Sequence, residues 1–225
     1  MADSSLFRLS LTEKHRPRTW AEVVGQEKIV TRLQGMLART GLAGRAYFLA
    51  GGSGQGKTTI ARLISAEVAD EFMIREVDAS ALTVAELREL ERESQVSGWG
   101  AKTGRAYIIN ECHALRKDVI RQLLVTLERI PSHVCWVFTT TNDNEEALFE
   151  DCLDASPLLS RCVELRLARR NLAEAFAKRA KEIAEAKGLD GRALKDYVRL
   201  ASEKMQKPRA LRGFLSSGCF MKPLP

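Results

Sequence analysis

The stretch Gly51-Gly52-Ser53-Gly54-Gln55-Gly56-Lys57-Thr58 decides the fold of this 225-residue chain. A short apolar run, residues 46–50, precedes the stretch, and a helical pattern, residues 60–64, follows it. Glycines let the backbone curl until successive N–H groups point inward, and the start of a helix adds partial positive charge. A glycine-rich turn that arose by chance would not require a strand before it and a helix after it. Strand, loop and helix together therefore predict a site for the phosphates of a nucleoside triphosphate.

The side chains at the end of this stretch extend the prediction to the ligands. Lys57 would reach the β- and γ-phosphates, and the Thr58 hydroxyl would be a ligand of Mg²⁺. The residues expected to bind the nucleotide here are Gly51, Gly52, Ser53, Gly54, Gln55, Gly56, Lys57, Thr58 and Thr59.

The composition is that of an ordinary globular chain, with 45% hydrophobic and 28% charged residues. The first ten residues lack the apolar core of a signal peptide, and no segment is apolar for long enough to span a membrane. Five cysteines without a Cys-x-x-Cys pair favour a reducing, cytoplasmic setting over a disulfide framework or a zinc site. The net charge of +6 permits a polyanionic partner without requiring one.

Strand-like and helix-like segments alternate along the first three quarters of the chain. We expect strands near 46–50, 72–77, 106–109, 134–138 and 163–167, and helices near 27–39, 57–69, 83–94 (capped by Thr83) and 117–129. This alternation predicts an α/β domain over residues 1–167, with a parallel sheet covered by helices on both faces. From residue 168 the pattern is helical, with segments 172–187 and 191–204 and a third from Pro208. It predicts a small all-helical lid domain over residues 168–225.

Polar residues after the later strands are candidates for catalysis. Glu111 follows a buried-type strand, where a carboxylate would polarise the water that attacks the γ-phosphate. Asn142 follows the next strand and would hold the same water or a phosphate oxygen, although asparagine is common in such turns. Arg161 and Arg209 would stabilise the transferring phosphoryl group, although each alone is more often a surface arginine. Their order behind the glycine loop favours the catalytic interpretation.

This ordered set of motifs resembles the AAA+ ATPases, and within them the motor subunits of DNA-polymerase clamp loaders. The glycine loop looks like Walker A and residues 107–111 look like Walker B, while Thr141-Asn142 and Pro208-Arg209 look like sensors 1 and 2. Residues 14–17 and 23–26 look like the family's N-terminal box. Leu158-Leu159-Ser160-Arg161-Cys162 is similar to the Ser-Arg-Cys motif, whose arginine completes the ATP site of the neighbouring subunit.

The resemblance implies an ATPase with ATP and Mg²⁺ as cofactors. By it, Val23 and Val24 line the adenine pocket, Arg161 acts in trans and Arg209 acts in cis. The family's Walker B aspartate, which orients the Mg²⁺ shell, is replaced by Asn110, and this replacement would weaken metal binding and slow turnover. The family's zinc insertion and helical collar have no counterpart, so the chain is either a fragment or assembles through its AAA+ and lid domains alone.

The leading hypothesis is an ATPase that assembles head to tail with other AAA+ subunits and acts on DNA and a sliding clamp during DNA replication. Primed or double-stranded DNA would be bound through its phosphates. The candidates for this contact are Lys102, Arg105, Arg116 and Lys117, which are equally well explained as a solvated basic rim. Trp99 is interpreted as cover for the core rather than as a partner contact.

Two alternatives stay open. An ATP-binding assembly subunit that hydrolyses weakly is favoured by Asn110 and opposed by Glu111 and the two arginines. Another DNA-acting AAA+ machine, such as a helicase loader or a branch-migration motor, is favoured by the lack of collar sequence and opposed by the Ser-Arg-Cys motif.

Overall fold

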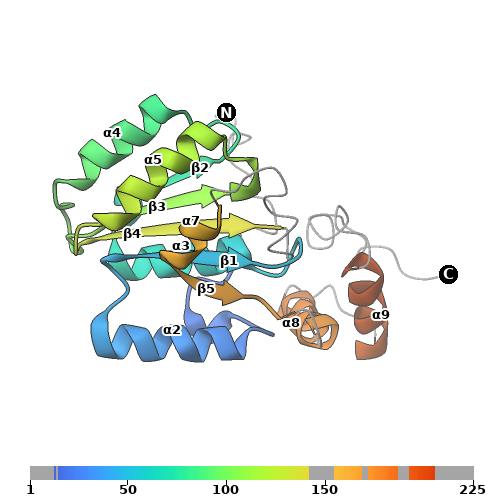
Figure 1. Ribbon diagram of the computed structural model, residues 1–225. Coiled ribbons are helices and arrows are strands. Elements are labelled where there is room, and N and C mark those ends of the chain that lie inside the picture. Colours follow the sequence, from blue (N-terminus) through green and yellow to red (C-terminus); the bar gives the residue numbers. More distant parts are fainter. Residues whose placement is uncertain (1–12, 14, 142–154, 169–171, 187–192, 206–225) are drawn as a thin grey trace, which may run out of the picture. The chain divides into compact units, whose positions relative to one another are not determined.

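The computed structural model describes residues 13, 15–141, 155–168, 172–186 and 193–205 (Figure 1). Packing within the chain forms two compact units. One is Gln26–Leu167, and the other combines Met1–Gly25 with Ala168–Pro225. The division into domains 1–167 and 168–225 stays a prediction.

The larger unit is built on a parallel sheet of five strands in the order β2-β3-β4-β1-β5. The strands are β1 (Arg45–Ala50), β2 (Ile74–Asp78), β3 (Arg105–Asn110), β4 (Val134–Thr140) and β5 (Cys162–Arg166). All seven residues of the central strand β4 are buried, as expected for a strand covered on both faces. The sheet confirms the predicted α/β class.

Helices supply the crossovers that parallel strands require. They are α3 (Lys57–Val68), α4 (Val84–Ser94), α5 (Lys117–Glu128) and the short α7 (Ala155–Ser160), whereas α2 (Glu27–Thr40) precedes β1. Helices α4 and α5 lie side by side over one face of the sheet, and α3 packs against β1, β3 and β4 from the other (Figure 1). The predicted cap of α4 is confirmed, because the Thr83 hydroxyl accepts from Glu86 N at 3.2 Å and the Glu86 carboxylate accepts from Thr83 N at 2.8 Å.

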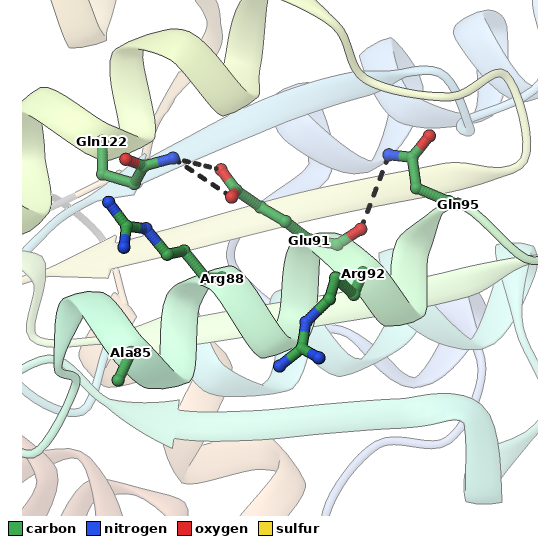
Figure 2. Close-up of a pocket in the computed structure, with 6 residues that line it drawn as sticks. All are labelled: Ala85, Arg88, Glu91, Arg92, Gln95 and Gln122. Carbon is green, nitrogen blue, oxygen red and sulfur yellow. Dashed lines mark hydrogen bonds between the residues drawn. The ribbon is translucent and has the colours of Figure 1, made fainter.

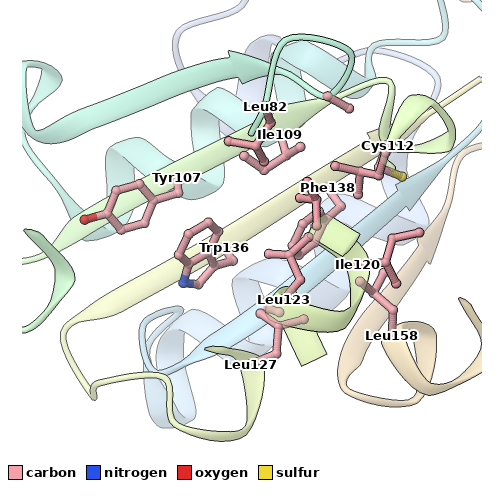
Figure 3. Close-up of a cluster of buried hydrophobic side chains, with 14 of the residues drawn as sticks. Leu82, Tyr107, Ile109, Cys112, Ile120, Leu123, Leu127, Trp136, Phe138 and Leu158 are labelled. Atoms are coloured by element: carbon pink, nitrogen blue, oxygen red, sulfur yellow. The ribbon is translucent and has the colours of Figure 1, made fainter. Parts of the chain in front are cut away.

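The main core lies between the sheet and the pair α4 and α5 (Figure 3). Alternate residues of β3 and β4 face it, and the rings of Tyr107 and Trp136 stack with centroids 4.5 Å apart. Leucines of α5, among them Leu123 and Leu127, belong to the same cluster of buried side chains (Figure 3). The core therefore fixes the strand ends and the last turn of α5 in one rigid arrangement.

Two expectations about aromatic residues are wrong. Phe72 lies in the turn η2 (Glu71–Met73) rather than in a strand, and β2 begins only at Ile74. Trp99 is 72% exposed and does not cover the core; its ring lies 5.6 Å from that of Phe72, which is itself 61% exposed. The apolar residues near position 72 thus include one that contacts Trp99 at the surface as well as those of the strand.

The smaller unit contains α8 (Leu172–Ala186) and α9 (Leu194–Met205), together with the turn η1 (Trp20–Glu22). Small residues let the two helices approach closely, and the shared core consists of Ala177, Ala180, Ala184, Tyr197 and Ala201. A Cβ atom at Gly25 would lie 2.6 Å from Leu172 Cδ2, so the start of α8 needs glycine at that position. The third helix, predicted from Pro208, lies outside the described residues.

Within the described residues, no helix is long and apolar enough to cross a bilayer. Cys112, Cys135 and Cys162 are free thiols. Burial raises the pKa of Cys135 to about 12, so this thiol stays protonated and unreactive at neutral pH. The same described part of the chain contains no group of three His, Cys, Asp or Glu side chains placed to hold a metal ion.

Candidate functional site

The glycine-rich loop joins the end of β1 to the start of α3 at the carboxyl edge of the sheet (Figure 1). Gly54 and Gly56 have φ angles of 80° and 99°, in the left-handed region that favours glycine. A Cβ atom at Gly51 would lie 2.6 Å from Gln55 Oε1 and 2.9 Å from Leu167 Cβ. The loop therefore depends on its glycines, and it leaves the backbone open to close approach by an anion.

The Lys57 side chain folds back over this loop. Its Nζ donates hydrogen bonds to the carbonyl oxygens of Gly51 at 2.6 Å and Gly52 at 2.9 Å, and the residue is only 7% exposed. Gln55 Oε1 is buried and has no hydrogen-bond partner among the described residues. A buried ammonium beside a glycine cradle suits a polyphosphate. The residues present therefore fit a nucleotide.

Strand β4 connects this loop to the predicted catalytic carboxylate. Gly51 N donates to the Thr140 carbonyl at 3.3 Å, on the side of β4 that pairs with β1. On the other side, which pairs with β3, Glu111 N donates to Thr139 Oγ1 at 3.4 Å. The glycine loop and Glu111 consequently flank the end of one strand.

Glu111 is the only non-glycine residue with a positive φ in the described part of the chain, at 53°. This left-handed conformation ends β3 and turns the chain into η3 (Cys112–Ala114). Thr141 Oγ1 donates to Glu111 Oε2 at 3.0 Å, and His113 Nδ1 lies 3.5 Å from the same oxygen. A carboxylate oriented in this way on an unfavourable backbone conformation is typical of functional sites.

Sequence reasoning misses most of these supporting contacts. Three consecutive threonines at the end of β4 each make a hydroxyl contact in this region. Besides the contacts of Thr139 and Thr141 with Glu111, Thr140 Oγ1 lies 3.3 Å from His113 Nδ1. The available signal is the run Thr139–Thr141 directly after the apolar residues 134–138. The sequence motifs connect only Thr141, the last of the three threonines, with the site.

Asn110 is bonded to protein groups on both sides. Its Nδ2 donates to Glu76 Oε1 at 2.7 Å, and its Oδ1 accepts from Thr139 Oγ1 at 3.0 Å. The other oxygen of Glu76 accepts from Arg62 Nε at 2.9 Å. An aspartate could not donate to Glu76, so asparagine here fits its neighbours; its role as a metal ligand stays a prediction.

Asn110→Asp is therefore expected to lower the free energy of unfolding by about 1–3 kcal/mol, because it turns a hydrogen bond into a contact between two carboxylates. Adding Glu76→Gln supplies a donor to the introduced carboxylate and should recover most of the loss. Urea unfolding of the four chains in this cycle measures the coupling. An Asn110→Asp chain as stable as wild type at pH 8 would contradict the account.

Arg161 lies between α7 and β5. Its Nη1 donates to the Pro157 carbonyl at 2.8 Å, and its Nη2 pairs with the carboxylate of Glu128. The sequence pattern does not connect Glu128 with this arginine. The position of Arg161 relative to a neighbouring subunit stays a prediction.

Several predicted site residues cannot be compared with this geometry. Asn142 and Arg209 lie outside the described residues. Val23 and Val24 belong to the other unit, so the adenine pocket stays a prediction. Thr58, predicted to bind Mg²⁺, is half-buried. It lies in the first turn of α3, which follows the glycine loop directly in the sequence.

The four basic residues suggested for DNA do not form one surface. Lys102 and Arg105 lie at the amino end of β3, where they donate to the carbonyl oxygens of Ala66 and Val96. Arg116 and Lys117 follow the carboxyl end of the same strand. The two ends of this six-residue strand are about 20 Å apart, because an extended chain rises about 3.3 Å per residue. Proximity in the sequence conceals this separation.

An open groove of about 670 Å³ lies along α4 (Figure 2). Arg88, Arg92 and Gln95 line it, and Gln122 of α5 closes it by donating to Glu91 at 3.0 and 3.1 Å. These contacts join two helices, and none of the lining residues belongs to the motifs of the candidate site.

The chain is similar in sequence to subunits of DNA polymerase III. It is 32% identical over 182 residues to DNA polymerase III subunit tau of Salmonella typhimurium and, equally, of Escherichia coli strain K12, covering 70% of this chain and 26% of each relative. It is 28% identical over 212 residues to the tau subunit of Bacillus subtilis, covering 84% of this chain and 35% of that protein. The chain thus spans between a quarter and about a third of the length of these relatives.

Solved structures share the fold at lower identity. The RuvB Holliday junction branch migration motor of Thermotoga maritima superposes with a TM-score of 0.66 at 22% identity, covering 89% of this chain and 63% of that one. Domain III of the replication initiation protein DnaA from the same organism gives 0.56 at 17% identity, covering 84% and 80%. The AAA family, "ATPase family associated with various cellular activities", matches residues 47–161, which contain the glycine loop, Glu111 and Arg161. That match covers more than half of the chain, and the chain therefore belongs to the AAA ATPase family.

Proposed function

We propose that the chain is an ATP-hydrolysing AAA+ subunit that works in an oligomer with other AAA+ subunits and acts on DNA and a sliding clamp during replication. The observation that carries the proposal is the placement of the Lys57 loop and Glu111 on the two sides of the end of β4. Similarity to DNA polymerase III tau subunits supports replication as the setting.

The residues at this edge of the sheet divide the chemistry of hydrolysis. Backbone N–H groups of the loop and the Lys57 ammonium bind and orient the phosphates. Magnesium, when bound, neutralises charge on the β- and γ-phosphate oxygens; Thr58 would hold it, with Asn110 as the second predicted ligand. Glu111, held by Thr141, orients the attacking water and accepts its proton.

Arginines complete the proposed site. Arg161 would stabilise charge on the nucleotide of the neighbouring subunit, and Arg209 would do so in its own chain. Asn142 would hold the attacking water or a γ-phosphate oxygen. A head-to-tail interface repeats the same contact from one subunit to the next, so every site but the last in an open spiral receives an arginine.

Asn110 favours a second candidate, a subunit that binds ATP and hydrolyses it weakly. Its carboxamide carries no charge and is bonded to Glu76 and Thr139, so it offers little to a magnesium shell. Such a chain would hold an assembly together through bound ATP and depend on active partners for turnover.

The test is ATP hydrolysis by the wild-type chain with and without primed DNA, beside an Arg161→Ala variant. We expect DNA to stimulate turnover, and the variant to lose about tenfold or more while it binds ATP like wild type, because its own nucleotide loop is intact. Wild-type turnover at background, even with DNA and assembled oligomer, would favour the weakly hydrolysing subunit. If the Arg161→Ala variant hydrolyses ATP as fast as wild type, Arg161 has no role in the site.

A further inference from the structure

Arg161 is held by two groups of its own chain that come from different elements. The Pro157 carbonyl belongs to α7, and Glu128 is the last residue of α5. Arg161 and Glu128 are 33 residues apart in sequence, so the fold and not the local chain brings them together. The guanidinium is bonded through Nη1 to one element and through Nη2 to the other.

Both acceptors are next to residues of the main core (Figure 3). Leu127 precedes Glu128 and is 6% exposed, while Leu158 follows Pro157 and is 1% exposed. Side chains packed this closely fix the backbone on which they stand. The two acceptors are therefore fixed relative to each other, and a guanidinium that bonds to both has one preferred orientation.

Stability alone does not account for this arrangement. The side chains of Arg161 and Glu128 are 30% and 56% exposed, and ion pairs this accessible to water stabilise proteins only weakly. The pair Arg92–Glu89 on α4 shows the ordinary case, with partners three residues apart on one helix and 75% and 54% exposed. Arg161 differs in that its Nε is buried and has no hydrogen-bond partner in the described part of the chain.

We propose that Glu128 is a positioning residue for Arg161, which fixes the guanidinium in the orientation that reaches the phosphates of the neighbouring subunit's nucleotide. The proposal rests on the trans role of Arg161 in the proposed function. A long arginine side chain loses many rotamers when it becomes ordered, and an arginine that is ordered before assembly loses fewer at the interface. Glu128 acts through Arg161 and touches neither nucleotide nor water.

Two chains that each lack one half of a shared site provide the test. The Arg161→Ala chain keeps its nucleotide loop, and the Lys57→Ala chain keeps its arginine. Mixed with ATP and primed DNA, they are expected to regain turnover where the second chain donates Arg161 to the first. The donor then carries, besides Lys57→Ala, one of three further changes: Glu128→Ala, Glu128→Gln or, as a matched control, Glu89→Ala.

With saturating Glu128→Ala donor we expect kcat to fall about tenfold at an unchanged KM for ATP, because the nucleotide loop belongs to the other chain. The Glu128→Gln donor should retain most of the turnover, since its amide oxygen still accepts from Nη2, and the Glu89→Ala donor should retain all of it. Equal turnover with every donor, or faster turnover with Glu128→Ala, would overturn the positioning role and leave the shared site standing. A mixture that never regains turnover would overturn the shared site and this inference together.

Discussion

Replacing Lys57 by alanine is expected to weaken ATP binding about 100-fold or more and to remove turnover. The ammonium is almost fully buried over the glycine loop and already held by the carbonyls of Gly51 and Gly52. A phosphate that enters the loop meets this charge away from bulk water, where a charged hydrogen bond contributes up to about 3 kcal/mol. Each tenfold change in affinity corresponds to about 1.4 kcal/mol, so the loss of this contact alone accounts for the expected factor.

Fluorescence titration with a labelled ATP analogue measures this effect directly. The control is Lys102→Ala, because Lys102 also donates to a backbone carbonyl, that of Ala66, but lies outside the glycine loop. We expect the control to bind nucleotide like wild type. Binding by Lys57→Ala within a few-fold of wild type would show that nucleotide does not occupy this loop.

Glu111→Gln is expected to separate turnover from binding. Glutamine keeps an oxygen that accepts from Thr141 and keeps the backbone of β3, but it cannot accept a proton from water. General bases of this kind contribute about 100-fold to 10,000-fold, so turnover should fall at least about 100-fold while the affinity for ATP stays within a few-fold. Single-turnover hydrolysis beside equilibrium binding distinguishes the two quantities, with Glu89→Gln on α4 as the control. Undiminished hydrolysis would assign the base to another residue.

The parts of the fold that could be predicted are those whose signal is local. Neighbouring residues are enough to predict the glycine loop between an apolar strand and a helix. The same is true of the cap of α4 at Thr83. The sequence places strand β2 two residues too early, because apolar character at Phe72 says nothing about whether the ring is buried. Helix α7, six residues long, is too short to show a period, and the pattern does not predict it.

The parts of the candidate site that could not be predicted depend on residues far apart in sequence. Glu76 and Asn110 come from adjacent strands, and Glu128 and Arg161 meet through tertiary packing. No spacing rule connects such pairs before the strand order is known. Glu111 itself is identified because it follows a buried-type strand behind the glycine loop, whereas its left-handed backbone has no sequence signature.

The bond between Asn110 and Glu76 also limits how this chain can change over evolutionary time. A donor faces an acceptor across two strands, so a lone change to aspartate passes through a less stable intermediate. The two positions should therefore drift as a pair, and descendants that carry aspartate at one position should carry a donor at the other. Asn110 and Glu76 therefore act as one unit, and a change that keeps this hydrogen bond must suit both residues together.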